Sequence, residues 1–222
     1  MERAIGVLAL LGIVAKLGFS AIQRGGWPLV VTPEVIIASA AAAILWHLLD
    51  RRGSELKLDA VIFYAIVAGL LIWGFARRPA PQAASVGDSG QQTWLFVSHL
   101  ALVLACGAFV EASSLAFTSL LTERQTNKQA DMDSTESAGR CTVLLGLSLL
   151  TASLLLAAVG AQYTRGVYWS WTISESWQLL VWLFYTTLWC AFTLSGRSWQ
   201  RLRGLTALGL FLSLLIFIAM ER

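Results

Sequence analysis

The sequence predicts an all-α fold: a polytopic transmembrane helical bundle of about seven spans with a tryptophan-rich loop on its outer side. Of the 222 residues, 57% are hydrophobic and only 13% are charged, whereas a typical soluble domain has about 25% charged residues. The apolar residues fall into separate runs, each near the ~20 residues that cross a hydrocarbon core. All four prolines lie between these runs, so none interrupts a predicted span.

The runs follow one another along the whole chain. The first resembles a signal peptide, but more apolar runs follow it, so we interpret it as an uncleaved first span. The prolines lie in "GGWPLVVTPE" before the second run and in "RRPAPQ" after the third. We therefore predict one integral membrane domain over residues 1–222, with spans at 4–23, 34–50, 59–76, 93–122, 141–162, 177–195 and 204–220.

Positive charge is distributed unevenly between the two sets of loops. The N-terminus and the second, fourth and sixth loops contain ten Lys and Arg residues, and the other side contains five. Because basic residues favour the cytoplasmic side, we expect a cytoplasmic N-terminus in a bacterial inner membrane and an outer tryptophan-rich loop. The polar segment 122–140 is then cytoplasmic, and its composition predicts a solvated linker. The net charge of +3 is too small to suggest nucleic-acid binding.

The predicted outer loop contains the segment "RGVYWSWTISESW", residues 165–177, and six of the ten tryptophans lie between positions 169 and 199. An interfacial aromatic belt explains one or two tryptophans at each helix end. A dense cluster of rings also suits a large planar apolar ligand, which would stack on them. Arg165, beside these rings, could pair with a carboxylate on such a ligand.

His99 lies about two turns into the fourth predicted span, near the depth of the aromatic loop. An ionisable residue inside a span is a functional candidate, and neutral imidazole is a common metal ligand, including to haem iron. The alternative is a histidine hydrogen-bonded to a neighbouring helix. For His47, near the cytoplasmic end of the second span, we expect an interfacial role without a ligand. For Glu34, Glu111 and Lys16 we expect structural pairing, with Lys16 either snorkelling or pairing with Glu34.

Several classes of site find no support in the sequence. Cys106, Cys141 and Cys190 lie in apolar runs without CxxC or CxxCH spacing, which argues against a zinc site, a thioredoxin motif and covalent haem attachment. We expect these cysteines to serve in packing. The sequence contains no phosphate loop, no HExxH motif and no serine or cysteine with a recognisable base partner. It therefore gives no indication of a hydrolase.

The aromatic segment resembles the signature W-G-x-Y-W-x-W-D-P-x-E-x-W of the haem-handling cytochrome c assembly proteins. Two other segments also resemble this family: "WLFVSHLALVLACGAF" is similar to its histidine-bearing span, and "GGWPLVVTPEVIIASAAAAILW" to an early segment whose glutamate matches Glu34. The resemblance places His99 on a haem-flanking position. In the signature itself the matching residues are Gly166, Tyr168, Trp169, Trp171, Glu175 and Trp177.

The sequence also departs from that pattern. Arg165 replaces the first tryptophan of the signature, Thr172 its aspartate and Ile173 its proline. Cys190 lies about where many members have a histidine, and the C-terminal histidine of the full-length ligation proteins is missing. At 222 residues we expect no equivalent of their large extracytoplasmic domain, so in size and outline the chain resembles the shorter HemX-like relatives more closely.

The resemblance implies a protein that binds and delivers haem, as a chaperone or transfer factor more than as an enzyme. His99 would ligate the haem iron, and the remaining cofactor-binding residues would be Arg165, Tyr168, Trp169, Trp171, Glu175 and Trp177. The implied partners are the lipid bilayer, haem, and other membrane subunits of a cytochrome assembly or respiratory complex. An alternative is a non-catalytic membrane subunit or regulator, of such a complex or of tetrapyrrole synthesis, that kept the scaffold and lost haem ligation. The sequence supports a transporter less well, because it shows no repeated halves and no broken spans.

Overall fold

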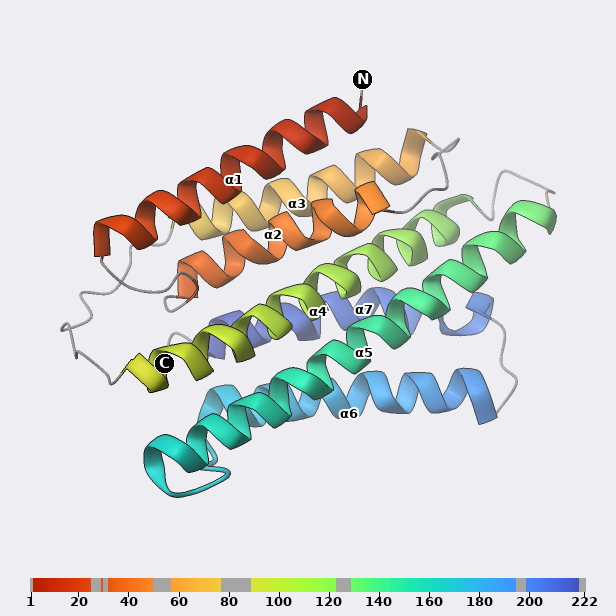
Figure 1. Ribbon diagram of the computed structural model, residues 1–222. Coiled ribbons are helices and arrows are strands. Elements are labelled where there is room, and N and C mark those ends of the chain that lie inside the picture. Colours follow the sequence, from red (N-terminus) through yellow and green to blue (C-terminus); the bar gives the residue numbers. More distant parts are fainter. Residues whose placement is uncertain are drawn as a thin grey trace.

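The computed structural model describes residues 2–24, 29, 32–49, 57–76, 89–122, 129–194 and 199–219. Within them the chain forms an α-helical bundle (Figure 1), and the predicted fold class, an all-α membrane bundle, is confirmed. The described residues of every predicted span lie in a helix. The helices are α1 (Glu2–Arg24), α2 (Thr32–Leu49), α3 (Lys57–Ala76), α4 (Ser89–Thr122), α5 (Gln129–Arg165), α6 (Ile173–Leu194) and α7 (Trp199–Ala219).

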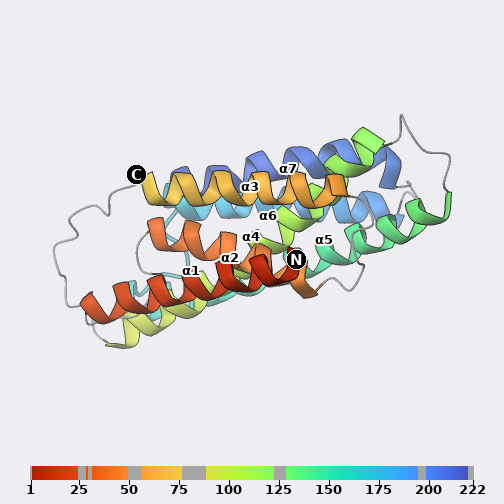
Figure 2. The same cartoon turned by 90° about the horizontal axis from the view of Figure 1, so that it is seen from above.

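Helices α1, α4, α5 and α6 contain apolar stretches long enough to cross a membrane. The described apolar stretches of α2, α3 and α7 are shorter, at 10–17 residues. Successive helices run in alternating directions, so α1 begins and α7 ends at opposite ends of the bundle (Figures 1 and 2). The α5–α6 loop lies at the end where α2 and α4 begin. The alternating directions agree with the prediction that successive loops lie on opposite sides of the membrane.

Helix α4 lies at the centre of the bundle, where it packs against α2, α3, α5 and α7 (Figure 1). Its middle portion is almost entirely buried. Helix α1 packs against α2 and leaves apolar side chains such as Leu8, Phe19 and Ile22 exposed, which suits a helix that faces lipid. The apolar surface of this chain is therefore divided between a protein core around α4 and a lipid-facing exterior.

The contact between α2 and α4 is unusually close. A Cβ atom added to Gly107 would lie 2.7 Å from the backbone carbon of Ala42 and 2.8 Å from the nitrogen of Ala43. The facing stretch of α2, Ala38–Ala43, consists of small buried residues. Small residues let helix backbones approach closely. In lipid there is no hydrophobic driving force between helices, so this close packing contributes to their association.

The other end of the α2–α4 contact contains a polar pair. His47 Nδ1 lies 3.3 Å from Glu111 Oε1, and the imidazole ring stacks on Phe63 with 4.2 Å between ring centroids. The expected structural pairing of Glu111 is confirmed. His47, for which we expected an interfacial role without a ligand, has a side chain that is 15% exposed and contacts the buried carboxylate of Glu111.

The predicted linker at 122–140 was wrong in its second half. Helix α5 begins at Gln129, so its first turns extend beyond the apolar run that predicted the span. Glu136 and Arg140 form an i,i+4 ion pair there, an arrangement that supports a polar helical segment. Residues 123–128, like most of the proline-containing segments 25–31 and 77–88, lie outside the described residues.

We predict that Gly107→Ala destabilises the bundle by about 1–3 kcal/mol, because the new methyl group meets backbone that cannot move without separating α2 from α4. Gly69→Ala in α3 is the matched control, since a Cβ there has no neighbour within 4 Å. Thermal unfolding in detergent should show a lowered midpoint for the first variant and an unchanged or raised one for the second. Equal midpoints would contradict the close contact.

Candidate functional site

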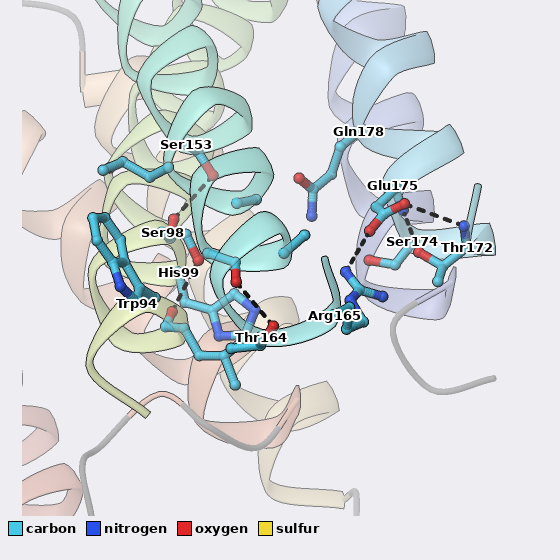
Figure 3. Close-up of a pocket in the computed structure, with 15 residues that line it drawn as sticks. Trp94, Ser98, His99, Ser153, Thr164, Arg165, Thr172, Ser174, Glu175 and Gln178 are labelled. Carbon is cyan, nitrogen blue, oxygen red and sulfur yellow. Dashed lines mark hydrogen bonds and ion pairs between the residues drawn. The ribbon is translucent and has the colours of Figure 1, made fainter. Parts of the chain in front are cut away.

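A pocket of about 330 Å³ lies between α4, α5 and α6, at the end of the bundle that contains the α5–α6 loop (Figure 3). Its volume is at the lower end of the range of small-molecule sites. Its walls combine polar and apolar groups from all three helices. It is lined by Trp94, Leu95, Ser98, His99, Ser153, Leu156, Ala157, Gly160, Ala161, Thr164, Arg165, Thr172, Ser174, Glu175 and Gln178.

The pocket brings together three of the predicted site residues: His99, Arg165 and Glu175. The four predicted rings do not line it. Trp171 and Tyr168 are 73% and 65% exposed, and Trp169 packs edge to face with Trp171. Trp177 is half-buried against the hydrophobic core.

His99 is oriented by a backbone carbonyl. Its Nδ1 lies 2.8 Å from the carbonyl oxygen of Leu29. Because a carbonyl can only accept, Nδ1 carries the proton and the neutral ring keeps a lone pair on Nε2. Histidines that bind metals are commonly held in this way, with the second nitrogen donating to a carbonyl or carboxylate. The alternative predicted from sequence was a hydrogen bond to a neighbouring helix, whereas the observed partner, Leu29, precedes α2. The bond leaves Nε2 available.

Glu34 in turn holds Leu29 in place. The Leu29 N–H donates to Glu34 Oε2 at 3.0 Å, and the Ser20 hydroxyl donates to Glu34 Oε1 at 2.6 Å. Leu29 has a φ of 66°, a left-handed conformation that costs a non-glycine residue about 1–2 kcal/mol. A buried carboxylate that accepts this peptide N–H stabilises the strained conformation. Glu34, Leu29 and His99 thus form a continuous chain of hydrogen bonds from α2 to α4.

The amine of Lys16 lies over the Phe75 ring, 3.4 Å from its centroid. This cation–π contact between α1 and α3 is a form of structural pairing that the sequence did not specify. It is separate from the pocket, which Lys16 does not line.

The aromatic segment is organised by a helix stop and a helix start. Gly166 has a φ of 71°, and its N–H donates to the Gln162 carbonyl at 3.0 Å, which ends α5 in a left-handed cap. Thr172 begins α6: its hydroxyl accepts the Glu175 N–H, and Glu175 accepts the Thr172 N–H, both at 3.3 Å. This reciprocal arrangement is a capping box. Glycine, threonine and glutamate therefore have local structural reasons to occupy these positions.

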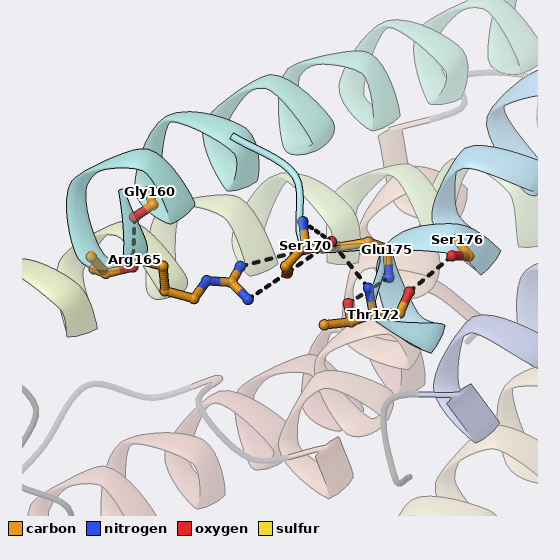
Figure 4. Close-up of polar contacts among 7 residues, drawn as sticks. Gly160, Arg165, Ser170, Thr172, Glu175 and Ser176 are labelled. Atoms are coloured by element: carbon orange, nitrogen blue, oxygen red, sulfur yellow. Dashed lines mark hydrogen bonds and ion pairs between the residues drawn. The ribbon is translucent and has the colours of Figure 1, made fainter. Parts of the chain in front are cut away.

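Arg165 and Glu175 connect the two helix ends (Figure 4). Their ion pair measures 3.0 Å, and Arg165 also donates to the Ser170 hydroxyl at 2.6 Å. The Ser170 N–H donates to Glu175 at 3.0 Å, so one carboxylate organises the whole turn. The sequence had suggested a ligand carboxylate as the partner of Arg165; the structure places the carboxylate of Glu175 there.

The loop holds Trp171 in a strained position. Its φ of 54° is left-handed and rare for a bulky residue, and its side chain is largely exposed. The buried Nε1 of Trp169 has no hydrogen-bond partner among the described residues. Strained backbone and unsatisfied donors occur preferentially at functional sites, which makes the ring cluster a candidate for ligand contact.

Among the polar or aromatic groups of the pocket that sequence reasoning missed are Trp94, Ser153 and Gln178. Ser153 donates to the carbonyl of Ser98 at 2.9 Å and so links α5 to α4. Trp94 packs near Tyr163, with ring centroids 6.5 Å apart. Ser153 and Gln178 could have been identified as polar side chains within apolar runs. Their position relative to His99, however, depends on the packing of α5 and α6 against α4.

The fold and the pocket together define a polytopic helical membrane protein with a partly polar pocket at one end of the bundle. The model of the cytochrome c assembly protein family matches residues 30–221. Because this match extends over most of the chain, the protein belongs to that family.

Individual relatives give the same family and show how much of each protein is shared. The cytochrome c biogenesis protein CcsA of Synechococcus sp. strain CC9605 is 25% identical over 239 residues, covering 90% of this chain and 77% of the relative. The CcsA of Synechococcus sp. strain CC9902 is 31% identical, covering 80% and 45%. That of Chlamydomonas reinhardtii is 28% identical, covering 73% and 49%. In the last two, less than half of the relative is aligned with this chain.

We predict that Thr172→Ala frays the start of α6 and lowers stability by about 1 kcal/mol, whereas Thr172→Asp retains it, because aspartate caps helices as well as threonine does. Hydrogen exchange of the first turn of α6, followed by mass spectrometry, would measure the effect locally. Faster exchange in both variants would show that the hydroxyl has a role other than capping.

Proposed function

We propose that this member of the family is a haem-handling protein that binds haem at the pocket of His99 and passes it on during cytochrome c assembly. The observation that carries the proposal is the hydrogen bond between His99 Nδ1 and the Leu29 carbonyl in a pocket between three helices. It fixes the imidazole in the tautomer that can ligate iron through Nε2. The names of the relatives, which are cytochrome c biogenesis proteins, support the same role.

The donor set of the pocket fits a haem better than a bare metal ion. Within the described part of the chain, no group of three or more His, Cys, Asp and Glu side chains could hold a metal. One imidazole is enough for iron that already has four nitrogen ligands from a porphyrin. Trp94 and the apolar side chains Leu95, Leu156 and Ala161 give the pocket walls that suit a porphyrin edge.

The residues of the chain would have separate roles toward that group. His99 would hold the iron, and Glu34 with Leu29 would keep its ring in position. Tyr168 and Trp171, which are exposed beside the pocket, would offer stacking surface to the part of the porphyrin that extends beyond the walls, with Trp169 and Trp177 behind them. Arg165 and Glu175 would hold the loop in shape. The bound haem would supply redox chemistry, so the protein would act as a chaperone or transfer factor more than as an enzyme.

We place the pocket on the outer side of a bacterial inner membrane and the N-terminus in the cytoplasm. The distribution of Lys and Arg between the loops supports this orientation. The chain would act as a single membrane domain with other membrane subunits of a cytochrome assembly complex, which would deliver haem to the pocket or take it away.

The visible absorption spectrum of the purified protein, oxidised and reduced, tests the proposal. We expect a Soret band after purification or after addition of haem, and a shifted or much weaker band in His99→Ala, because the described pocket contains a single imidazole. His47→Ala is the matched control, since its ring pairs with Glu111 away from the pocket. A protein that stays colourless with added haem would instead support a scaffold that has lost haem ligation.

Glu34 should affect haem binding through His99. We predict that Glu34→Gln weakens haem binding about 10–100-fold, the usual effect of removing an outer-shell partner, because the amide provides one acceptor oxygen where the carboxylate provides two. The iron spin state, read from the absorption and electron paramagnetic resonance spectra, should also change. Glu136→Gln, which removes the ion pair with Arg140 in α5, should leave both unchanged. An unaltered spin state in Glu34→Gln would mean that the carboxylate serves stability alone.

A further inference from the structure

Gln178 is a buried polar side chain whose hydrogen-bonding groups are unused. It is 7% exposed, lines the pocket from α6, and makes no hydrogen bond to any residue that the structure describes. Figure 3 shows its carboxamide extending from α6 toward the α5 wall. Its amide atoms are not among the fully enclosed side-chain atoms that have no hydrogen-bond partner, so they reach the pocket that Gln178 lines. Because neighbouring core positions of α6, such as Val181 and Leu188, are apolar, Gln178 is the buried residue of this stretch that can hydrogen-bond an occupant of the pocket.

The groups around Gln178 favour an anionic or carboxylate-bearing partner. Glu175 lies one turn earlier on the same face of α6, but its charge is balanced by Arg165 at 3.0 Å. A guanidinium has five N–H donors, and the hydrogen bonds of Arg165 to Ser170 and Glu175 account for two of them. Arg165, at the end of α5, and Gln178, on α6, both line the pocket, which therefore contains N–H donors beside a carboxylate whose charge is already paired.

We propose that Gln178 donates a hydrogen bond to a carboxylate arm of the ligand and so determines its specificity. This inference rests on the proposed function: the arm would be a haem propionate, while His99, on the α4 side of the pocket, would hold the iron. Gln178 would then distinguish porphyrins with free carboxylates from porphyrins whose carboxylates are blocked. Arg165 would add charge attraction without giving up its ion pair with Glu175.

The test compares the binding of haem and of haem dimethyl ester, in which both carboxylates are methylated, to the detergent-purified full chain. Metal-free protoporphyrin IX and its dimethyl ester are measured alongside, by their fluorescence. The variants are Gln178→Leu, which keeps the volume but removes the amide, and Gln178→Glu, which adds a negative charge. Gln162→Leu is the control, because Gln162 is half-buried on α5 and does not line the pocket.

We expect the wild type and Gln162→Leu to prefer the free acids, and Gln178→Leu to reduce that preference about tenfold, the size expected for one hydrogen bond to a charged group. Gln178→Glu should reduce it further, because the glutamate repels the propionate while the ester is less affected. A loss of binding that is larger for the free acid than for the ester cannot arise from misfolding, which would weaken both ligands together.

The outcomes separate this inference from the proposed function. Haem binding that depends on His99 but shows the same acid-to-ester ratio in every Gln178 variant would overturn the inference alone. A ratio that depends on Gln178 for the metal-free porphyrin, without any iron ligation by His99, would uphold the inference and overturn the proposed iron site. A wild type that binds neither porphyrin would overturn both.

Discussion

The close packing of α2 on α4 is the contact on which the other features of this bundle depend. Gly107 lets the backbone of Ala42 and Ala43 approach to a distance that any larger residue would prevent. The same pair of helices then makes a polar contact on each side of this point. Toward one end, Glu34 and the adjacent Leu29 reach His99; toward the other, His47 reaches Glu111.

This arrangement explains why ionisable residues are tolerated inside apolar helices. A carboxylate or imidazole within a span is costly unless a neighbouring helix supplies its partner. Trp46 illustrates how exactly the register must be kept, because its Nε1 donates to the carbonyl of Leu104 at 3.1 Å across the same interface. A shift of α2 along α4 would separate that bond and both ionisable contacts at once. Tight packing of small residues thus keeps the polar groups of the interface in register.

The fold was largely predictable from the sequence, and the site only in part. Apolar runs and proline positions determined the helices, because lipid requires each span to satisfy its own backbone. Composition also identified His99, Glu34 and Glu111 as unusual. It did not identify their partners, because the link from Glu34 to His99 passes through the backbone of Leu29. Every residue has a backbone carbonyl, so the sequence cannot single out the one that accepts a hydrogen bond. Gln178 was missed for a related reason: only the packing of α6 places it opposite His99.

The residues of the aromatic segment fall into two sets with different roles. One set forms the turn between α5 and α6, and the other consists of the aromatic rings. Gly166, Thr172 and Glu175 end one helix and begin the next, and these roles tolerate substitution as long as the replacement can cap a helix. Threonine in place of the signature's aspartate therefore retains the turn. Arg165, in place of a tryptophan, gives Glu175 an ion-pair partner and ties the two helix ends together.

The second set consists of the aromatic rings that the turn between α5 and α6 carries. Trp171 is held in a left-handed backbone conformation with most of its surface exposed, which no packing requirement of the core explains. Its strain is sustained by the hydrogen bonds of Ser170 and Thr172 to Glu175 on either side. Thr172 and Ile173 differ from the signature at the start of α6, and Arg165 replaces one of its rings with an ion-pair partner for Glu175. The other four rings of the signature remain. The turn is therefore explained by its own hydrogen bonds, whereas the exposed rings are explained by the ligand contact that we propose for them.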